Sequence, residues 1–330
     1  MSHTQPIRLL HYGLGPIGLG VVRQVADRSD MVSVAGVDIR PEVAGKDVGE
    51  LAGLGRDLGA SVTATVGEAV GGAQVAVVCT GSHLSDVEPQ IMELVQAGLN
   101  VISTCEELSY PFWHHPEESR RIDDAAKRSG VTVLGTGVNP GFVMDLLPLI
   151  ASGVCLRVDS VYVRRVVDAG TRRGPLQAKV GAGMSVEEFR AGVQTGKLGH
   201  KGFVESVAMI ADALELGVDT ISENIQPKLL DRSFGPWRAG QVAGIDQTAT
   251  GLRQGEAVVS LRLLMYVNAD DPRDRIVLRG VPEVRWTLEG GTPGDQATAA
   301  ITVNTIRRVL AAPPGLTSMK DLPPAHWARG

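Results

Sequence analysis

The stretch Ile7–Gly18, which reads IRLLHYGLGPIG, decides the fold of this chain. It opens with a short apolar run, Ile7–Tyr12, typical of a buried strand, and leads through a glycine loop into an amphipathic segment, Ile17–Ala26. In a G-x-G-x-x-G loop, the glycines allow a tight turn, close approach to a pyrophosphate and close helix–strand packing. A strand, this loop and a helix in that order predict a dinucleotide-binding unit. We expect its cofactor contacts at Gly13, Gly15, Pro16, Ile17 and Gly18, where the helix N-terminus attracts phosphate.

An acidic residue, Asp38, follows the glycine loop by about twenty positions and ends the second predicted strand. Such a carboxylate accepts hydrogen bonds from the adenine-ribose hydroxyls and favours NAD. Arg40 could instead pair with the 2′-phosphate of NADP, although it could equally be a solvated charge on a loop. We therefore expect the site to accept both NAD and NADP.

The first 145 residues alternate apolar strands with helical stretches. Near-continuous Val, Ile and Ala in the strands indicate a parallel sheet covered on both faces. The remaining expected strands are Met31–Asp38, Gln74–Thr80, Asn100–Thr104 and Val131–Thr136, and the helices among them are Val87–Ala97 and Glu117–Ser129. Residues 1–145 are thus predicted to form a Rossmann-type α/β domain.

The pattern changes over residues 146–296. Longer, partly alternating strands indicate a largely antiparallel sheet with one wet face. One helix should start at Ser185, with Glu188 three residues on completing a capping box, and another should run from about Gly202 to Leu216. The expected strands are Asp159–Asp168, Glu256–Asn268, Arg273–Arg279 and Val284–Glu289. We predict an inserted α+β domain here, followed over 297–330 by a helix, Ala297–Ala311, and a tail that return to the first domain.

Composition excludes several classes of protein. The net charge of −5 and the few aromatic residues (4 Trp, 4 Tyr, 5 Phe) argue against nucleic-acid binding. No apolar run reaches the ~18 residues of a membrane span, and the N-terminus lacks the pattern of a signal peptide. Three widely spaced cysteines predict neither a disulfide framework nor a zinc site, and the histidines lack metal-ligand spacing. We expect a cytoplasmic protein without a metal.

The chemistry should lie beyond the carboxyl ends of the parallel strands. Thr80, Ser82 and Thr104 stand there and are suited to line the nicotinamide ribose and amide. Glu106 and Glu107 follow directly, and one of them could transfer protons or stabilise a developing cation. The alternative is that both carboxylates merely complement the dipole of the next helix.

Two further residues near these loops carry open interpretations. A lone cysteine after a strand, such as Cys105, is more often packed than reactive. His200 precedes the second helix of the inserted domain, where it could reach a ligand or serve as a surface or cap histidine.

Several motifs together resemble one family. The segments are Tyr12–Gly18, Gly45–Glu50 with Asp38, Ser103–Pro111, Gly137–Phe142 and Gly199–Gly202. They are similar to those of the 2,4-diaminopentanoate dehydrogenase family, which includes the native amine dehydrogenases and is related in fold to dihydrodipicolinate reductase. The resemblance implies NAD(P)-dependent, reversible oxidative deamination of a primary amine to a ketone or aldehyde, and in reverse reductive amination with ammonia.

The resemblance also implies roles for single residues. A glutamate of the Glu106–Glu107 motif is implied as the catalytic carboxylate, and we favour Glu107. Asn139 and His200 match positions that line the substrate pocket, and Asn304 matches a position near the C-terminus that we assign to the cofactor. The family commonly has a small apolar residue where this chain has Lys201, which bears on the substrate. The resemblance further implies a homodimer, and a large antiparallel sheet often leaves a flat apolar face to bury.

Two alternatives stay open. One is a reductase of C=N or C=O bonds in a carboxylated intermediate, as in dihydrodipicolinate reductase. Basic residues that grip two carboxylates would support it, unless they belong to a solvated strand face; the candidates are Arg164, Arg165, Arg172, Arg173 and Lys179. The other is a nucleotide-sensing dimer without turnover. An amine dehydrogenase is favoured because a fixed carboxylate stabilises the iminium cation of the reaction.

Overall fold

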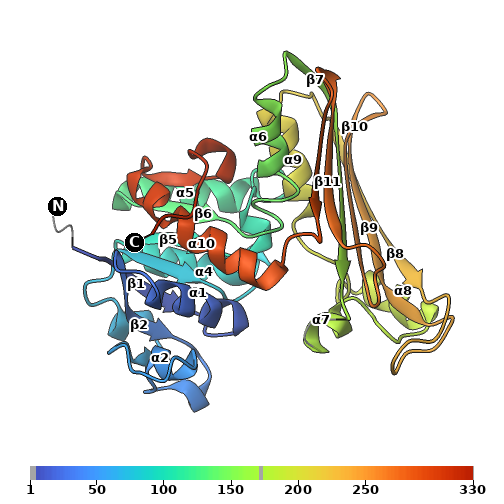
Figure 1. Cartoon of the computed structure of the whole chain (residues 1–330). Coiled ribbons are helices and arrows are strands. Elements are labelled where there is room, and N and C mark those ends of the chain that lie inside the picture. The colour runs from blue at the N-terminus through green and yellow to red at the C-terminus, as the bar shows by residue number, and fades with distance from the viewer. Residues whose placement is uncertain (1–4, 171–173, 330) are drawn as a thin grey trace. The chain divides into compact units, whose positions relative to one another are not determined.

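The computed structural model describes residues 5–170 and 174–329. The chain forms two compact units, one from Met1–Phe142 with Pro293–Gly330 and one from Val143–Thr292 (Figure 1). The second unit is therefore an insertion in the chain of the first, because segments of the first unit precede and follow it. Two candidates for binding carboxylates, Arg172 and Arg173, lie outside the described residues.

The first unit contains a parallel sheet, as its apolar strands predict. Its strand order is β13-β6-β5-β4-β1-β2-β3, and every adjacent pair is parallel. Leu9 and Leu10 point to opposite faces, and both are fully buried, because helices cover the two faces. The strands are β1 (Ile7–Tyr12), β2 (Met31–Val37), β3 (Val62–Thr63), β4 (Val75–Val78), β5 (Asn100–Ser103), β6 (Thr132–Gly135) and β13 (Gly315–Thr317).

Two helix pairs accompany this sheet: α1 packs against α10, and α4 packs against α5 (Figure 1). The α-helices are α1 (Pro16–Ala26), α2 (Val48–Leu51), α3 (Val66–Ala69), α4 (Leu84–Gln96), α5 (Pro116–Ser129) and α10 (Gly294–Ala311). The 3-10 helices are η1 (Pro41–Val43), η2 (Glu106–Leu108) and η3 (Met319–Asp321). The C-terminal segment is tied to the first unit through strand β13 and through the ion pair between Arg307 and Asp30 at 2.6 Å.

The second unit contains a six-stranded sheet in the order β12-β11-β7-β10-β9-β8. All its pairs are antiparallel except β7 with β10, so the sheet is largely antiparallel as expected. The strands are β7 (Arg157–Asp168), β8 (Thr220–Leu229), β9 (Val242–Arg253), β10 (Glu256–Tyr266), β11 (Arg273–Val281) and β12 (Val284–Glu289). Its helices are α6 (Leu146–Ser152), α7 (Gly174–Lys179), α8 (Val186–Gln194) and α9 (Phe203–Ala213). The capping box between Ser185 and Glu188 is present as predicted.

Strands β8 and β9 were not predicted from the sequence. β8 exposes most of its residues and carries Glu223, Asn224 and Gln226, so it lacks a continuous apolar run. In β9, Gly244 and Gly251 interrupt the pattern because a Cβ at either position would clash with β10 or with α9 and its neighbours. Both strands are held by their partners in the sheet and by the buried helix α9, which packs on them.

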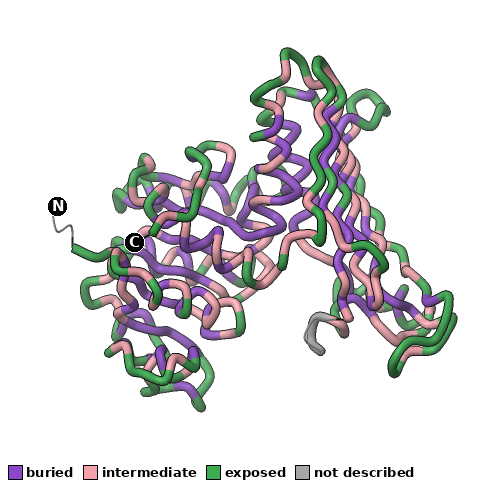
Figure 2. Tube along the Cα trace, in the orientation of Figure 1, coloured by how far each residue is buried: buried purple, intermediate pink, exposed green. Residues whose placement is uncertain are grey.

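One face of this second sheet is polar, and the expectation of a flat apolar face is wrong. Tyr162, Arg164, Ser260, Arg262 and Arg275 alternate with buried residues along their strands. Figure 2 shows the alternation of buried and more exposed positions along the strands of this sheet. The helices α6, α8 and α9 pack on the sheet, and α9 is apolar and almost wholly buried. The apolar side chains of the strands are thus used within the unit.

The structure also bears on membrane spans, disulfides and metal sites. None of their helices is both long and apolar enough to cross a membrane. Cys79, Cys105 and Cys155 are free thiols. Among residues 5–170 and 174–329, no three His, Cys, Asp or Glu side chains are grouped to hold a metal ion.

Strand β1 buries an imidazole, and this predicts a pH-dependent stability. His11 is 1% exposed, and its Nε2 lies 2.8 Å from Ser33 Oγ. Burial lowers the pKa of His11 from 6.5 to about 4, so the folded state keeps it neutral. The stability that this contributes is complete above pH 6.5 and is lost as the pH falls toward 4, because the unfolded chain then binds a proton that the folded chain does not.

We expect the free energy of unfolding to fall by about 2 kcal/mol between pH 7.5 and 5 through His11 alone. Urea unfolding of the wild type and of His11→Val at both pH values measures this contribution, because the difference between them removes other titrating groups. Equal losses in the two proteins would contradict the assignment.

Candidate active site

The glycine loop forms a cradle at the N-terminus of α1. Gly13 has φ +87°, and a Cβ on it would lie 2.7 Å from the carbonyl oxygen of Cys79. A Cβ on Gly18 would collide with the carbonyl oxygen of Gly13, whereas no atom lies within 4 Å of a Cβ built on Gly15. Neither a capping side chain nor an acidic residue occupies the first turn of α1. The open space above Gly15 and the uncapped helix fit the pyrophosphate of a dinucleotide.

Asp38 and Arg40 form one unit beside this cradle. The carboxylate of Asp38 accepts hydrogen bonds from the backbone N–H of Leu14 at 2.8 Å and from Arg40 Nε and Nη2, both at 2.9 Å. Burial raises the pKa of Asp38, but the hydrogen bonds from Arg40 and Leu14 outweigh burial and hold it at about 2. Arg40 is 44% exposed, and Asp38 is 7% exposed. Arg40 is therefore a partner of Asp38 as well as an exposed cation.

As expected, Thr80, Ser82 and Thr104 follow the carboxyl ends of β4 and β5. Each of them makes at least one hydrogen bond within the protein. Thr80 Oγ1 donates to Gln90 Oε1 at 2.6 Å, and the backbone N–H of Thr104 donates to the Val78 carbonyl at 3.0 Å. The carbonyl oxygen of Ser82 accepts from the backbone N–H of Glu107 at 3.3 Å. Because β4 is the neighbour of β1, these loops adjoin the glycine loop at one edge of the sheet.

Asn304 lies elsewhere. It lines a small pocket of about 90 Å³ with Arg28, Met31 and His326. Met31 begins β2, so this pocket belongs to the amino ends of the strands, opposite to the edge of the glycine loop. The structure thus does not bring Asn304 together with the other expected cofactor residues, because α10 has run toward the far edge by this position.

Glu106 and Glu107 begin the 3-10 turn η2, directly after β5. Gly135 of β6 allows this turn to lie close to the sheet, because a Cβ there would collide with the backbone carbonyl of Leu108 and lie 2.6 Å from the nitrogen of Ser109. Leu108 is fully buried and fixes the turn, while both glutamates are half-buried. Because a 3-10 helix has three residues per turn, the adjacent Glu106 and Glu107 leave the backbone of η2 in different directions.

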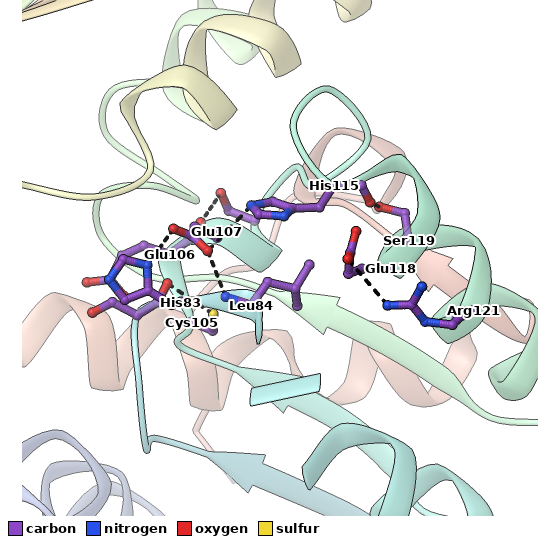
Figure 3. Close-up of polar contacts among 11 residues, drawn as sticks. His83, Leu84, Cys105, Glu106, Glu107, His115, Glu118, Ser119 and Arg121 are labelled. Carbon is purple, nitrogen blue, oxygen red and sulfur yellow. Dashed lines mark hydrogen bonds and ion pairs between the residues drawn. The ribbon is translucent and has the colours of Figure 1, made fainter. Parts of the chain in front are cut away.

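The carboxylate of Glu107 is held by three groups (Figure 3). Its Oε1 lies 2.7 Å from His83 Nδ1, and its Oε2 accepts from the backbone N–H of Leu84 at 2.7 Å. His115 Nε2 lies 3.4 Å from the same Oε2. Leu84 is the first residue of α4, so Glu107 complements the dipole of the helix before it in the chain, whereas the alternative interpretation invoked the helix after it.

His83 and His115 are the residues that sequence reasoning missed. These histidines lack metal-ligand spacing, so the sequence pattern assigns them no role. Both directly precede a helix, His83 as the N-cap of α4 and His115 as the N-cap of α5. Two histidines at helix starts near a Glu-Glu pair were the available signal, but only the packing of the two helices brings them to one carboxylate.

Cys105 is packed, as its position suggested. It is 1% exposed, and its Sγ donates to the carbonyl oxygen of Ser82 at 3.2 Å. Burial raises the pKa of this thiol to about 12, so it is not a nucleophile at neutral pH.

Comparisons with known proteins identify the family of this chain. The family profile described as the 2,4-diaminopentanoate dehydrogenase C-terminal domain matches residues 142–329. The 2,4-diaminopentanoate dehydrogenase of Acetoanaerobium sticklandii is 33% identical to the chain over 332 residues, which cover 97% of this chain and 94% of that protein.

The chain belongs to the 2,4-diaminopentanoate dehydrogenase family. The amine dehydrogenase of Streptomyces virginiae is 25% identical and covers 94% of this chain and 95% of its own length. A solved amine dehydrogenase from Mycobacterium smegmatis shares the fold with a TM-score of 0.87 at 24% identity, over 100% of this chain and 99% of that one. Two more distant solved structures also share the fold, each with a TM-score of 0.52: GenD2 from gentamicin A biosynthesis in complex with NAD, and an engineered D-amino acid dehydrogenase bound to NADP⁺. The family and the fold that the motifs indicated are confirmed.

The two residues matched to the substrate pocket of this dehydrogenase family lie in different units. Asn139 belongs to the first unit, in the loop after β6, and is 9% exposed. His200 belongs to the second unit, where its backbone N–H and carbonyl both bond to the side chain of Gln247, at 2.7 and 2.6 Å. The imidazole of His200 packs edge-on against Phe203 at 5.8 Å.

The basic residues of the reductase alternative do not form one cluster among the described residues. Arg165 is 3% exposed and pairs with the fully buried Asp274 at 3.2 Å. Its neighbour Arg164 is exposed on the opposite face of β7, because successive strand residues alternate. Lys179 is exposed at the end of α7. Because Arg165 is buried, the Arg164–Arg165 pair does not present two cations to one carboxylated substrate.

Proposed function

We propose that this protein is an NAD(P)-dependent amine dehydrogenase. It converts a primary ammonium substrate, NAD(P)⁺ and water into a ketone or aldehyde, ammonium, NAD(P)H and a proton, and it runs in reverse as a reductive amination. The observation that carries this proposal is the Glu106–Glu107 turn at the carboxyl end of β5, at the same edge of the sheet as the glycine cradle, in a member of this family. A carboxylate at this edge meets the requirement of a reaction that passes through a cation.

The residues that would hold the cofactor are those of the glycine cradle with Asp38 and Arg40. When bound, the nicotinamide supplies the hydride acceptor of the deamination. We propose that Thr80, Ser82 and Thr104 face its ribose and amide, since they stand at the carboxyl ends of β4 and β5. Asn304 is not retained in this group.

We also propose that both NAD and NADP are accepted. Asp38 suits the ribose hydroxyls of NAD, and the exposed guanidinium of Arg40 suits the 2′-phosphate of NADP. Arg40→Ala is expected to raise the Kd for NADP at least about tenfold, while the Kd for NAD stays the same or falls, because the oxygens of Asp38 are released. Fluorescence titration with NADH and NADPH measures both constants. A wild-type Kd ratio above about a thousandfold would contradict dual use.

Of the two glutamates, we assign the reacting centre to Glu106 and not to Glu107, which the sequence favoured. Both oxygens of Glu107 contact groups of the protein, namely the backbone N–H at the start of α4 and two histidines. Its negative charge is therefore used to bind these groups. We propose that the Glu106 carboxylate stabilises the iminium carbon–nitrogen centre and takes a proton from the water that attacks it. Asn139 and His200 are retained as proposed substrate-binding residues on the strength of the family motifs.

A deamination screen tests the proposed function. Purified enzyme is incubated with primary amines, with and without a carboxylate group, and with NAD⁺ or NADP⁺ in turn, and the formation of the reduced cofactor is followed at 340 nm. Amine-dependent reduction supports the proposal. Reduction of a dicarboxylate substrate without added ammonia, and no response to any amine, would support the reductase alternative.

A homodimer and a cytoplasmic location complete the proposal. On the polar face of the second sheet, Asp246 pairs with Arg262 of the same chain at 2.6 Å, and we propose that this face meets the same face of a second copy across a two-fold axis. Light scattering should then give twice the mass of the chain, and Asp246→Arg should shift it toward the monomer. The three free thiols suit a reducing compartment, which localisation of a tagged chain would test.

A further inference from the structure

The loop after β4 places an imidazole against the carboxylate of Glu107. His83 Nδ1 and Glu107 Oε1 are 2.7 Å apart. An ionised carboxylate only accepts hydrogen bonds, so Nδ1 carries the proton and Nε2 of the neutral ring carries the lone pair. The imidazole is 45% exposed, and within residues 5–170 and 174–329 its Nε2 has no hydrogen-bond partner.

Glu107 is itself fixed, so it fixes the ring in turn (Figure 3). Its second oxygen accepts the Leu84 N–H at 2.7 Å, and its own backbone N–H bonds to the Ser82 carbonyl at 3.3 Å. The carboxylate thus joins η2 to the start of α4 and cannot swing away. A fixed, half-buried carboxylate that holds one nitrogen of an exposed imidazole is the arrangement that orients a histidine base.

We propose that His83 is a second proton-transfer group of the deamination and that Glu107 is the residue that positions it, which rests on the amine dehydrogenase function proposed above. Nε2 of His83 takes a proton from the substrate's ammonium group. The nitrogen–hydrogen bond breaks, its electron pair stays on nitrogen, and a new bond forms between that proton and Nε2. The imidazolium then releases the proton to water at its exposed edge, which accounts for one proton released in the overall reaction.

Glu106 must keep its negative charge during the reaction, so another group has to take the first proton from the substrate. An ammonium nitrogen has no lone pair with which to form the C=N bond, so it must lose a proton before the hydride leaves carbon. If Glu106 took that proton, it would be neutral when the iminium cation forms and would no longer stabilise it. A base at His83, in the loop after β4, which is the strand between β5 and β1, leaves Glu106 ionised for that step.

His83→Asn and His83→Ala test this proposal together. The asparagine amide still offers an N–H to Glu107 but has no basic nitrogen, whereas alanine removes the whole ring. We expect kcat to fall about 10²-fold in both variants, with KM for the amine within about threefold of the wild type. Free imidazole should restore part of the kcat of His83→Ala and none of that of His83→Asn. His326→Asn, at an exposed position in the tail, is the matched control and should keep wild-type kinetics.

The positioning role of Glu107 has its own measurement. Glu107→Gln keeps the shape but weakens the hold on Nδ1, so we expect kcat to fall about tenfold at unchanged KM. Circular dichroism and the Kd for NAD(P)H report whether each variant is folded.

Two results would overturn the proposal. Either His83→Asn keeps kcat within about threefold of the wild type, so that a hydrogen-bonding side chain suffices, or imidazole fails to raise the kcat of His83→Ala. A wild-type enzyme without amine-dependent reduction of NAD(P)⁺ would instead refute the proposed function, so the two failures are distinguishable.

Discussion

Glu106→Gln is expected to lower kcat for amine deamination by at least about 10²-fold, which corresponds to about 2.7 kcal/mol of lost transition-state stabilisation. Glutamine keeps the size of the side chain and removes its charge and its proton affinity. The iminium centre then forms without a fixed negative charge in a half-buried site, where such a charge is worth far more than in water. The Kd for NAD(P)H should stay within about twofold, because the cradle that holds the cofactor is untouched.

Steady-state kinetics with a reactive amine from the screen measure this loss. An amine deuterated at the reacting carbon should show a larger isotope effect in the variant, since hydride transfer becomes the slow step. Glu117→Gln, an exposed glutamate of α5, is the matched control. Our assignment of the two carboxylates would be reversed by one result. In it, Glu106→Gln keeps kcat within about threefold of the wild type, whereas Glu107→Gln lowers kcat by about 10²-fold.

Gly135→Ala is expected to lower kcat by about 10²-fold although residue 135 bears no functional group. Its Cβ would collide with the Leu108 carbonyl and lie 2.6 Å from the nitrogen of Ser109, and both are backbone atoms that cannot rotate away. The turn η2 must therefore move outward, which takes Glu106 and Glu107 with it. A misplacement of about 1 Å in a reacting group can cost about 10²-fold in rate.

Overpacking at this position should also cost about 1–3 kcal/mol of stability, measurable by urea unfolding. Gly67→Ala is the control, because no atom lies within 4 Å of a Cβ there and Gly67 lies in helix α3. Wild-type kcat in Gly135→Ala would show that the turn and its carboxylates are not coupled to the reaction.

The longer strands and helices of the first unit could be read from the sequence because each carries its own signal, whereas the short elements β3, β13, α2 and α3 were not predicted. β1 is predicted with its observed bounds, and the glycine loop marks the start of α1 within one residue. β8 and β9 carry no such signal, because polar residues in β8 and glycines in β9 interrupt the apolar pattern. Pairing with neighbouring strands holds both in place. Local patterns thus predict an element only where the element buries a continuous or regularly spaced apolar set.

The candidate site divides in the same way. The sequence placed Glu106 and Glu107 beyond β5 and Asp38 beyond β2, because the ends of parallel strands share an edge of the sheet. It did not decide between the glutamates, because the direction of each side chain depends on how η2 packs on Gly135 and where α4 begins.

The amino-acid sequence by itself determined the dinucleotide-binding fold, the family and the position of the turn to which we assign the chemistry, since glycine spacing and apolar runs act through the local backbone. Only the tertiary structure decided that Glu107 holds His83, that Arg165 is buried against Asp274, and that Asn304 lies at the far edge. Each of those facts joins segments distant in the chain, and their meeting depends on the packing of whole helices and strands, which no short pattern encodes.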